Sequence, residues 1–206
     1  LYNPASIALS LTDTCFPITD SQIIYHNGLW HSMLHHGSFS SVDKVEMMAR
    51  CQQSRAELQQ ALHEATTVIV TFGTAWVYEM DGKVVANCHK QPHQLFSREL
   101  LTIEECEHYI EEIISYTPGR VLFTVSPVRH VSEGLEDNSL SKAILRVAID
   151  KACRKYNDRA SYFPSFEILI DDLRDYRFYG EDLVHPSQIG RASCRESGGI
   201  YSREVL

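Results

Sequence analysis

Two continuous runs of apolar, largely β-branched residues dominate the hydrophobic pattern of the chain. Residues 67–72 read Thr-Val-Ile-Val-Thr-Phe and residues 120–125 read Arg-Val-Leu-Phe-Thr-Val, without alternation of polar positions. Such runs are typical of strands that are buried on both faces of a parallel sheet. We therefore predict two central strands at these positions, and a shorter strand at residues 162–163, before Pro164.

Apolar residues that recur at helical spacing predict helices between and around these strands. Ser41 is a candidate N-cap for the first helix, and Asn138 or Ser139 for the third. Thr102 and Glu105 form the sequence of a capping box at the start of the second helix. Strands and helices that alternate with short links predict a doubly wound, three-layer α/β/α sandwich with a mainly parallel sheet. The three expected helices cover about residues 42–65, 103–116 and 139–156.

Two shorter segments depart from this alternation. Residues 76–79 and 83–86 are joined by Met-Asp-Gly, and because Asp-Gly is a strong tight-turn signal we predict a β-hairpin there, as an excursion from the sheet. Residues 25–41 are rich in His, Trp, Gly and Ser without a clean period, and we interpret them as a functional or connecting loop. Because no internal repeat or linker is visible, residues 1–190 are expected to form a single domain.

Composition and charge narrow the class of protein. A chain of 206 residues with 44% apolar content can bury a full core. Its formal net charge of −8 disfavours nucleic acid and anionic membrane surfaces as partners, because both require concentrated Lys and Arg. No apolar run approaches the roughly 18 residues that a membrane-spanning helix needs, and the first residues lack the regions of a signal peptide. We therefore expect a cytoplasmic location.

The cysteine pattern also favours a cytoplasmic location. All 6 are widely spaced and none forms a Cys-x-x-Cys pair, which argues against a zinc ribbon or a thioredoxin-type motif. Cys106 and Cys153 fall within predicted helices. Free thiols at such positions usually behave as small buried hydrophobes in a reducing compartment.

Candidate chemistry gathers after the predicted strands, at the edge where open α/β sheets bind ligands. Asp182 and His185, in the loop before the expected last helix, have the spacing of a general base and the carboxylate that orients it. Such a pair also arises by chance, and it needs a hydroxyl or thiol nucleophile within hydrogen-bond reach. Gly73 and Thr74, after the first strand, could present backbone N–H groups to an oxyanion, or form a plain turn.

Further polar residues extend the list of candidates. Arg129 and His130, after the second strand, could hold a carboxylate or a leaving group, or make a structural ion pair. Asn87 and His89 flank Cys88 in a polar run that suggests either substrate binding or a polar exit from the hairpin. A nucleophilic Cys88 is the less favoured interpretation, because nothing in the sequence places it beside a base.

A metal site is the weakest of the candidates. His31 and His35 are four residues apart, a spacing that would put both imidazoles on one face of a helix. No third ligand such as the Glu of His-Glu-x-x-His accompanies them, and such histidines are more often hydrogen-bonded or solvent-facing. We therefore expect no metal and no other cofactor, and keep a metal-dependent hydrolase only as an alternative.

Seven short words occur in order along the chain. Together they resemble the GSCFA family of bacterial proteins, within the wider SGNH (GDSL-like) hydrolase grouping, over about residues 1–190. The words are Leu-Tyr-Asn-Pro at 1–4, Trp-His with His-His-Gly-Ser-Phe-Ser at 30–40, Thr-Phe-Gly-Thr-Ala-Trp-Val-Tyr at 71–78, Val-Ala-Asn-Cys-His-Lys at 85–90, Thr-Val-Ser-Pro-Val-Arg-His at 124–130, Tyr-Phe-Pro-Ser-Phe-Glu at 162–167, and Asp-Leu-Arg-Asp-Tyr-Arg-Phe-Tyr at 172–179, which runs into the Asp182–His185 loop.

The resemblance implies a three-layer α/β/α fold with a catalytic Ser in an N-terminal block and a C-terminal Asp-x-x-His, matched here by Asp182 and His185. Gly73-Thr74-Ala75 stands where the SGNH grouping reads Gly-x-Asn, so the usual Asn oxyanion donor is absent. The Gly-Ser-Cys-Phe-Ala block would lie upstream of Leu1. On this resemblance we expect a chain that lacks its first strand and its nucleophile, and that is inactive by itself.

The resemblance favours an SGNH-type serine hydrolase or acyltransferase that acts on a small ester or an acylated carbohydrate. Asn87, His89, Arg129 and His130 would shape its substrate pocket. The alternative is a non-catalytic ligand-binding or scaffolding module of the same fold. Residues 191–206 lack an apolar period and are interpreted as a non-native tail or a polar C-terminus, and the oligomeric state is left open.

Overall fold

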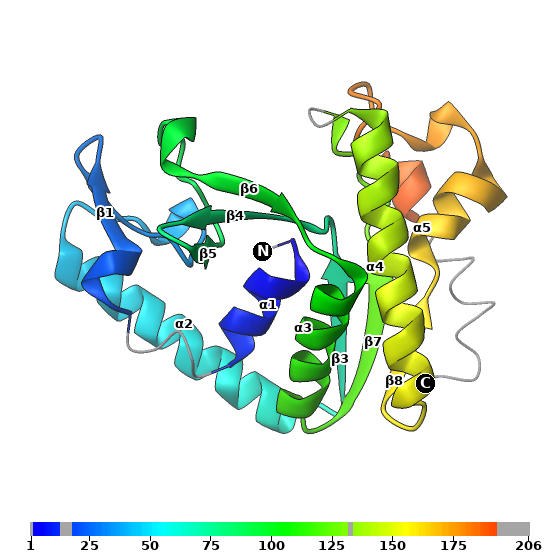
Figure 1. The fold of residues 1–206 in the computed structure, drawn as a ribbon, viewed down its shortest axis with the longest axis horizontal. Helices are drawn as coiled ribbons and strands as arrows, with labels where there is room; N and C mark the ends of the chain where they lie inside the picture. The colour runs from blue at the N-terminus through cyan, green and yellow to red at the C-terminus, as the bar shows by residue number, and fades with distance from the viewer. Residues whose placement is uncertain (1, 13–17, 132–133, 193–206) are drawn as a thin grey trace.

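Three parallel strands form the central sheet (Figure 1). They are β3 (Thr67–Phe72), β7 (Arg120–Val125) and β8 (Ala160–Phe163), hydrogen-bonded in the order β3-β7-β8. The structure is a computed structural model that describes residues 2–12, 18–131 and 134–192. All three strands lie where the hydrophobic pattern predicts them.

The helices that connect these strands flank the sheet. α3 (Ile103–Tyr116) leads into β7, α4 (Leu135–Lys155) leads from β7 to β8, and the two helices pack against each other. Their buried aliphatic side chains share one core with Phe72 and Phe123, whose stacked rings have centroids 5.8 Å apart. A parallel sheet flanked by helices confirms the predicted mixed α/β class and is consistent with a three-layer α/β/α fold.

The predicted second helix begins as its sequence indicates. The Thr102 hydroxyl accepts a hydrogen bond from the Glu105 N–H at 3.2 Å, and the Glu105 carboxylate accepts one from the Thr102 N–H at 2.8 Å. This reciprocal pairing is a capping box, and it satisfies two donors that a helix N-terminus leaves without intrahelical partners. The prediction for α3 is therefore confirmed from its cap to its last residue, Tyr116.

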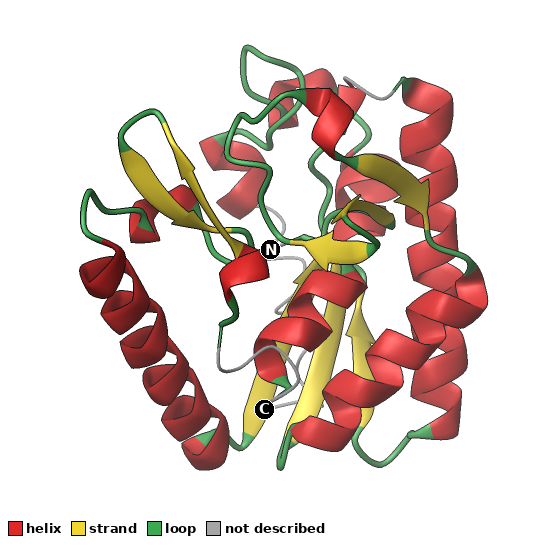
Figure 2. Cartoon of the chain, turned by 60° about the vertical axis from the view of Figure 1, so that its left-hand side comes forward, coloured by secondary structure: helices red, strands yellow, loops and turns green. Residues whose placement is uncertain are grey.

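The cap predicted for the first long helix is wrong by two residues. α2 (Lys44–Glu64) begins after Asp43, whose carboxylate accepts a hydrogen bond from the Val45 N–H at 2.8 Å. Ser41 lies outside the helix, where its hydroxyl accepts a hydrogen bond from the Asp43 N–H at 3.2 Å. Figure 2 shows α2 on the side of the molecule away from α4.

The cap predicted for the third helix is also wrong. α4 begins at Leu135, directly after Gly134, and Asn138 lies in its first turn. The Asn138 side chain instead accepts a hydrogen bond from the His130 N–H at 3.0 Å. The residue that resembles a cap in sequence therefore ties α4 to the loop after β7.

Residues 25–41 are not simply a loop, in contrast to the prediction. β1 (Ile23–His26) and β2 (Leu29–Ser32) form an antiparallel hairpin that turns at Asn27 and Gly28, with φ of 48° and 78°. Asn-Gly tolerates these positive φ angles and is a recognised hairpin signal. The flanking strands hide that signal in the sequence because their apolar and polar residues do not alternate.

The second hairpin is confirmed. β4 (Trp76–Met80) and β5 (Lys83–Val85) pair antiparallel, and the turn places Asp81 and Gly82 at φ of 50° and 71°. β6 (Ser97–Leu100), which the sequence analysis did not anticipate, pairs with the other edge of β4. The excursion from the parallel sheet is thus an antiparallel sheet of 3 strands.

β3 differs from the expectation that both of its faces are buried. Val70 and Phe72 are buried, whereas Thr67, Ile69 and Thr71 are exposed, and Ile69 retains 68% of its accessible surface. Among the described residues β3 pairs with β7 alone, so it is an edge strand. The alternation of buried and exposed residues shows that one of its faces is covered. A β-branched run does not by itself distinguish this situation from a fully buried strand.

Among the described helices, none combines the length and the apolar character that a membrane span requires. Of the predicted tail, Arg191 and Ala192 belong to a helical turn at residues 188–192, and residues 193–206 lie outside the described part of the chain. The short elements are α1 (Pro4–Leu11), η2 (Asp20–Gln22), η3 (Gly37–Phe39), η4 (His93–Leu95), α5 (Ser165–Glu167), η6 (Ile168–Leu173) and η7 (Tyr176–Phe178).

Candidate active site

Asp182 and His185 form a hydrogen-bonded pair within one tight loop. His185 Nδ1 lies 2.6 Å from Asp182 Oδ2, and Asp182 Oδ1 accepts hydrogen bonds from the backbone N–H groups of Val184 and His185 at 2.9 and 3.0 Å. The loop closes on itself through a hydrogen bond from the Gly180 N–H to the His185 carbonyl at 2.8 Å. Leu183 adopts a φ of 54°, which gives the sharp turn between carboxylate and imidazole.

The contacts of Asp182 determine its charge and the tautomer of its partner. The hydrogen bond to the His185 side chain, with those from the two backbone N–H groups, lowers the Asp182 pKa to about 2. The carboxylate is therefore ionised near neutral pH and can only accept hydrogen bonds. His185 must then carry a proton on Nδ1, which leaves Nε2 as the ring nitrogen that can take a proton from a substrate or a nucleophile.

His185 faces a cavity of about 460 Å³ at the carboxyl ends of β3 and β7. Most of its lining comes from the two segments that follow these strands and from the Asp182–His185 loop. This is the edge of an α/β sheet at which ligands generally bind. The lining residues are Tyr2, Gly73, Ser126, Val128, Arg129, His130, Val131, Val184 and His185.

Arg129 joins the loop after β7 to the Asp182–His185 loop. Its backbone N–H donates to the Val184 carbonyl at 3.1 Å, and its guanidinium donates to the Leu183 carbonyl at 3.4 Å. The guanidinium also lies over the ring of Tyr179, 4.1 Å from the centroid. These contacts hold the two loops together through carbonyls and an aromatic ring, and the binding role of Arg129 stays a prediction.

His130 contributes a buried ring nitrogen to the same cavity. Its Nε2 makes no hydrogen bond of regular geometry with a described residue, although the Gly73 backbone lies close enough to interact with the ring. Burial, with the nearby charge of Lys142, lowers the His130 pKa. The imidazole is therefore neutral near neutral pH and can donate to, or accept from, a bound polar group.

Lys142 supports the floor of the cavity. Its side chain is 2% exposed, and its ammonium group donates to the Gly73 carbonyl and, at 2.7 Å, to the Ser126 carbonyl. These two carbonyls belong to the residues that directly follow β3 and β7. Lys142 could not be identified from the sequence, because a single Lys in a helix usually faces solvent and no local pattern marks this one.

Gly73 and Thr74 directly follow β3, as expected, but their N–H groups already donate hydrogen bonds within the protein. Both donate to the Tyr2 carbonyl, at 2.6 and 3.2 Å. The Thr74 hydroxyl lies 3.1 Å from the Ser141 hydroxyl, which in turn accepts from the Ala75 N–H at 2.8 Å. An oxyanion would therefore have to displace the Tyr2 carbonyl, and the donor role of Gly73 and Thr74 stays a prediction.

Asn87 and His89 lie elsewhere. The cavities lined by His185 include neither residue. The Asn87 side chain accepts from the His89 N–H at 2.9 Å, and His89 Nε2 lies 2.8 Å from the Ser32 carbonyl on β2. Burial raises the pKa of the adjacent Cys88 thiol, the opposite of what an activated nucleophile requires.

The histidines considered as metal ligands do not share a helix. His31 lies on β2, and its ring is 4.7 Å from that of His89, whereas His35 lies in the following turn with its Nδ1 2.9 Å from the Ser32 hydroxyl. Within the described part of the chain, no three His, Cys, Asp or Glu residues form a group that could hold a metal ion. The helical-spacing argument for His31 and His35 is therefore wrong.

Comparison with known proteins adds the family. The sequence model of the GSCFA family matches residues 1–196, which include the parallel sheet and the Asp182–His185 loop. No curated protein matches the chain, and no solved structure matches it. Because the match covers nearly the whole sequence, the chain belongs to the GSCFA family.

Proposed function

We propose that the protein is an ester hydrolase or acyltransferase of the SGNH type, with His185 as general base and acid and Asp182 as the residue that orients it. The observation that carries this proposal is the 2.6 Å contact between His185 Nδ1 and Asp182 Oδ2. It places an ionised carboxylate on one side of the imidazole and leaves the other nitrogen for proton transfer beside a cavity at the strand ends.

In this mechanism His185 Nε2 takes the proton of a serine hydroxyl as the oxygen attacks the ester carbonyl. The tetrahedral intermediate collapses to an acyl-serine, and His185 returns the proton to the leaving alcohol. Water or an acceptor alcohol then attacks the acyl group, with His185 as base again. Asp182 stabilises the imidazolium that forms in both steps, and it does not need to become protonated.

On the family resemblance, we propose that the nucleophilic serine is the one in the Gly-Ser-Cys-Phe-Ala block. Within the described residues, Ser126 lines the 460 Å³ cavity with His185, and both Ser126 and Ser165 line a neighbouring cavity that also includes His185. The Ser126 hydroxyl accepts a hydrogen bond from the Val128 N–H at 3.2 Å, and no hydrogen bond joins it to His185. The Ser165 hydroxyl instead donates to the Val125 carbonyl at 2.8 Å. Ser126 is therefore the second candidate, to be considered if labelling occurs without that block.

The substrate we propose is a small ester or an acylated carbohydrate. The polar groups of the cavity, which include the His130 Nε2 nitrogen and the Ser126 hydroxyl, suit hydroxyl-rich ligands. A formal net charge of −8 supports a neutral or cationic substrate and argues against nucleic acid and anionic membrane surfaces as partners.

A serine-directed fluorophosphonate probe tests the proposal. We would label a chain that also carries the Gly-Ser-Cys-Phe-Ala segment and locate the labelled residue by mass spectrometry. His185→Ala should slow labelling by about 10²–10⁴-fold, the usual contribution of a general base. His63→Ala, which removes an exposed histidine on α2, is the matched control and should label at the wild-type rate. Equal labelling of His185→Ala and wild type would refute the assignment.

A non-catalytic binding module of the same fold is the second candidate. The observation that favours it is that both the Gly73 and Thr74 N–H groups donate to the Tyr2 carbonyl, which leaves no free donor there for an oxyanion. This alternative predicts no fluorophosphonate labelling of any serine. It also predicts that an acylated sugar binds, as measured by calorimetry, without release of its acyl group.

A further inference from the structure

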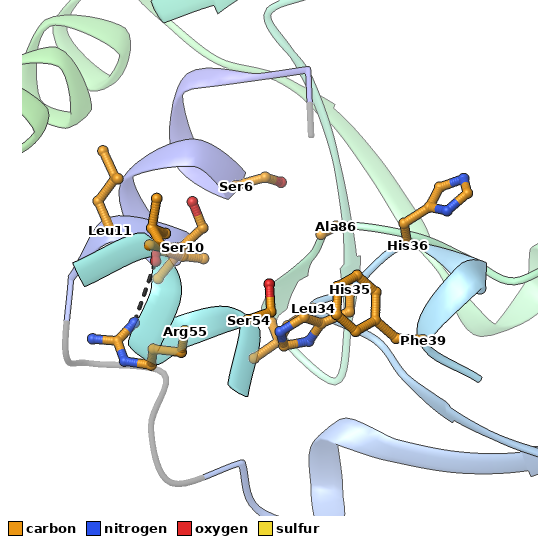
Figure 3. A pocket seen from close by; sticks show the side chains of 12 residues that line it. Ser6, Ser10, Leu11, Leu34, His35, His36, Phe39, Ser54, Arg55 and Ala86 are labelled. Atoms are coloured by element: carbon orange, nitrogen blue, oxygen red, sulfur yellow. Dashed lines mark hydrogen bonds between the residues drawn. The ribbon is translucent and has the colours of Figure 1, made fainter. Parts of the chain in front are cut away.

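A second cavity, of about 310 Å³, lies between α1, α2 and the turn after β2 (Figure 3). It shares no lining residue with the cavities at His185. Its volume is at the lower end of the roughly 300–1,000 Å³ that is usual for small-molecule sites. Its walls are mainly apolar, from Leu9, Leu11, Leu34, Phe39, Leu58 and Ala86.

Several polar groups around this cavity already have partners. The Ser10 hydroxyl donates to the Ile7 carbonyl at 2.7 Å, and the Arg55 guanidinium donates to the Ser10 carbonyl at 3.2 Å. His35 is hydrogen-bonded to the Ser32 hydroxyl, and burial lowers its pKa, so its ring is neutral near neutral pH. No Asp or Glu is among the lining residues.

Ser6 is different. Its side chain is 3% exposed, and no described residue forms a hydrogen bond with its hydroxyl. The Ser6 backbone N–H is held by the Asn3 cap of α1, so the hydroxyl is not needed for the helix. Figure 3 shows the Ser6 side chain pointing away from α1 toward the side on which Ala86 and His35 lie. A buried hydroxyl without a partner destabilises the protein until some group satisfies it.

We propose that this cavity binds a small aliphatic molecule with an uncharged oxygen head group, such as a medium-chain alcohol or its ester. The hydrocarbon chain occupies the apolar walls, and the Ser6 hydroxyl forms a hydrogen bond with the head-group oxygen. At roughly 30 Å³ per non-hydrogen atom, taken from the volume of a water molecule, the cavity holds about ten such atoms. 1-Octanol has this size and chemistry and serves as the probe.

Three variants test the proposal by titration of 1-octanol against methyl-labelled protein in NMR spectra. In the wild type, the methyl signals of Leu9, Leu34 and Leu58 should shift. Ser6→Ala should bind 1-octanol about two- to tenfold more weakly, the effect of one lost hydrogen bond. Ser115→Ala on α3 is the matched control, because it makes the same change at a helical hydroxyl that donates to a backbone carbonyl but lies outside the cavity lining, and its affinity should equal that of the wild type.

The Tm of the ligand-free protein gives a second readout. Ser6→Ala removes the unsatisfied hydroxyl and should raise the Tm of the ligand-free protein by about 2–4 °C. Ala86→Leu fills the cavity while keeping the backbone hydrogen bond from residue 86 to Met33, and it should weaken 1-octanol binding at least about tenfold.

Four results would overturn the proposal. The first is an absence of leucine methyl shifts in the wild type up to the solubility limit of 1-octanol. The second is equal affinity of Ser6→Ala and wild type. The third is a full set of shifts in Ala86→Leu, which would place the ligand elsewhere. A lower Tm for Ser6→Ala would show that the hydroxyl already has a partner and would remove the argument for a head group.

Discussion

The ammonium group of Lys142 donates a hydrogen bond to the Ser126 carbonyl at 2.7 Å, from a side chain that is 2% exposed. A second hydrogen bond reaches the Gly73 carbonyl. One lysine on α4 therefore holds together the segments that follow β3 and β7.

Lys142→Met keeps an unbranched side chain, one atom shorter, but leaves both carbonyls without this donor. Removing one partner of a buried hydrogen bond costs the desolvation of the group that remains, so we expect a loss of about 2–4 kcal/mol in the free energy of unfolding, measured with urea. The control is Lys151→Met on the same helix, whose partly exposed ion pair with Glu107 should contribute far less. Similar losses in both variants would contradict the role assigned to Lys142.

Arg129→Met should loosen the loop that carries the base. It removes the guanidinium from the ring of Tyr179 and from the Leu183 carbonyl, and the lost cation–π contact is worth about 1 kcal/mol. Hydrogen exchange of the Val184 and His185 amides should accelerate. Arg98→Met, which removes a comparable contact with Trp76, should leave the exchange of these amides unchanged. Unchanged exchange of these amides in Arg129→Met would show that the Arg129 side chain does not hold the loop.

The Asp182 carboxyl should titrate well below its ordinary range. Its folded-state pKa is about 2, against 3.8 for a free carboxyl, so the pair stabilises the fold above about pH 4. That contribution is lost as the pH falls through about 2. Carbon-13 NMR of the side-chain carboxyl should show the low midpoint, and His185→Ala should move it upward. An ordinary midpoint in the wild type would argue against the Asp182–His185 hydrogen bond in solution.

Gly190→Ala should disrupt the Asp182–His185 loop from a distance. A Cβ at residue 190 would clash with the backbone carbonyl of Phe178, next to the Ser187 N–H that donates to the same carbonyl at 2.8 Å. We expect the Asp182 titration to shift toward its ordinary value. Gly180→Ala is the control, because its Cβ would meet Asp182 and His185 atoms only at 3.5 Å, an ordinary contact distance. A shift of the Asp182 midpoint in Gly180→Ala but not in Gly190→Ala would contradict this prediction.

Features that depend on neighbouring residues could be predicted from the sequence. The capping box at Thr102 and Glu105 and the Asp81-Gly82 turn were expected, because their chemistry is complete within four residues. The Asn27-Gly28 turn carries the same kind of signal and was missed because its flanking strands lack a clear period. Asn138 shows the limit of such signals, since a suitable cap residue binds the His130 N–H instead.

Features that depend on distant partners could not be predicted. Lys142 acquires its role from carbonyls 69 and 16 positions away along the chain. The exposure of Ile69 depends on what packs against its face of the sheet, and that is a property of the assembled fold. The separation of Asn87 and His89 from His185 likewise follows from the β4–β5 hairpin, which carries them toward β2.

The Asp182–His185 pair has a consequence for the order in which the site forms. The two side chains are three residues apart, and the hydrogen bonds to Asp182 from Val184 and His185 are equally local. Closing such a short loop costs little chain entropy, whereas the contact of Lys142 with Gly73 closes a loop of 69 residues. The base and its orienter can therefore associate as soon as this loop forms, while the cavity that they serve appears only with the complete sheet.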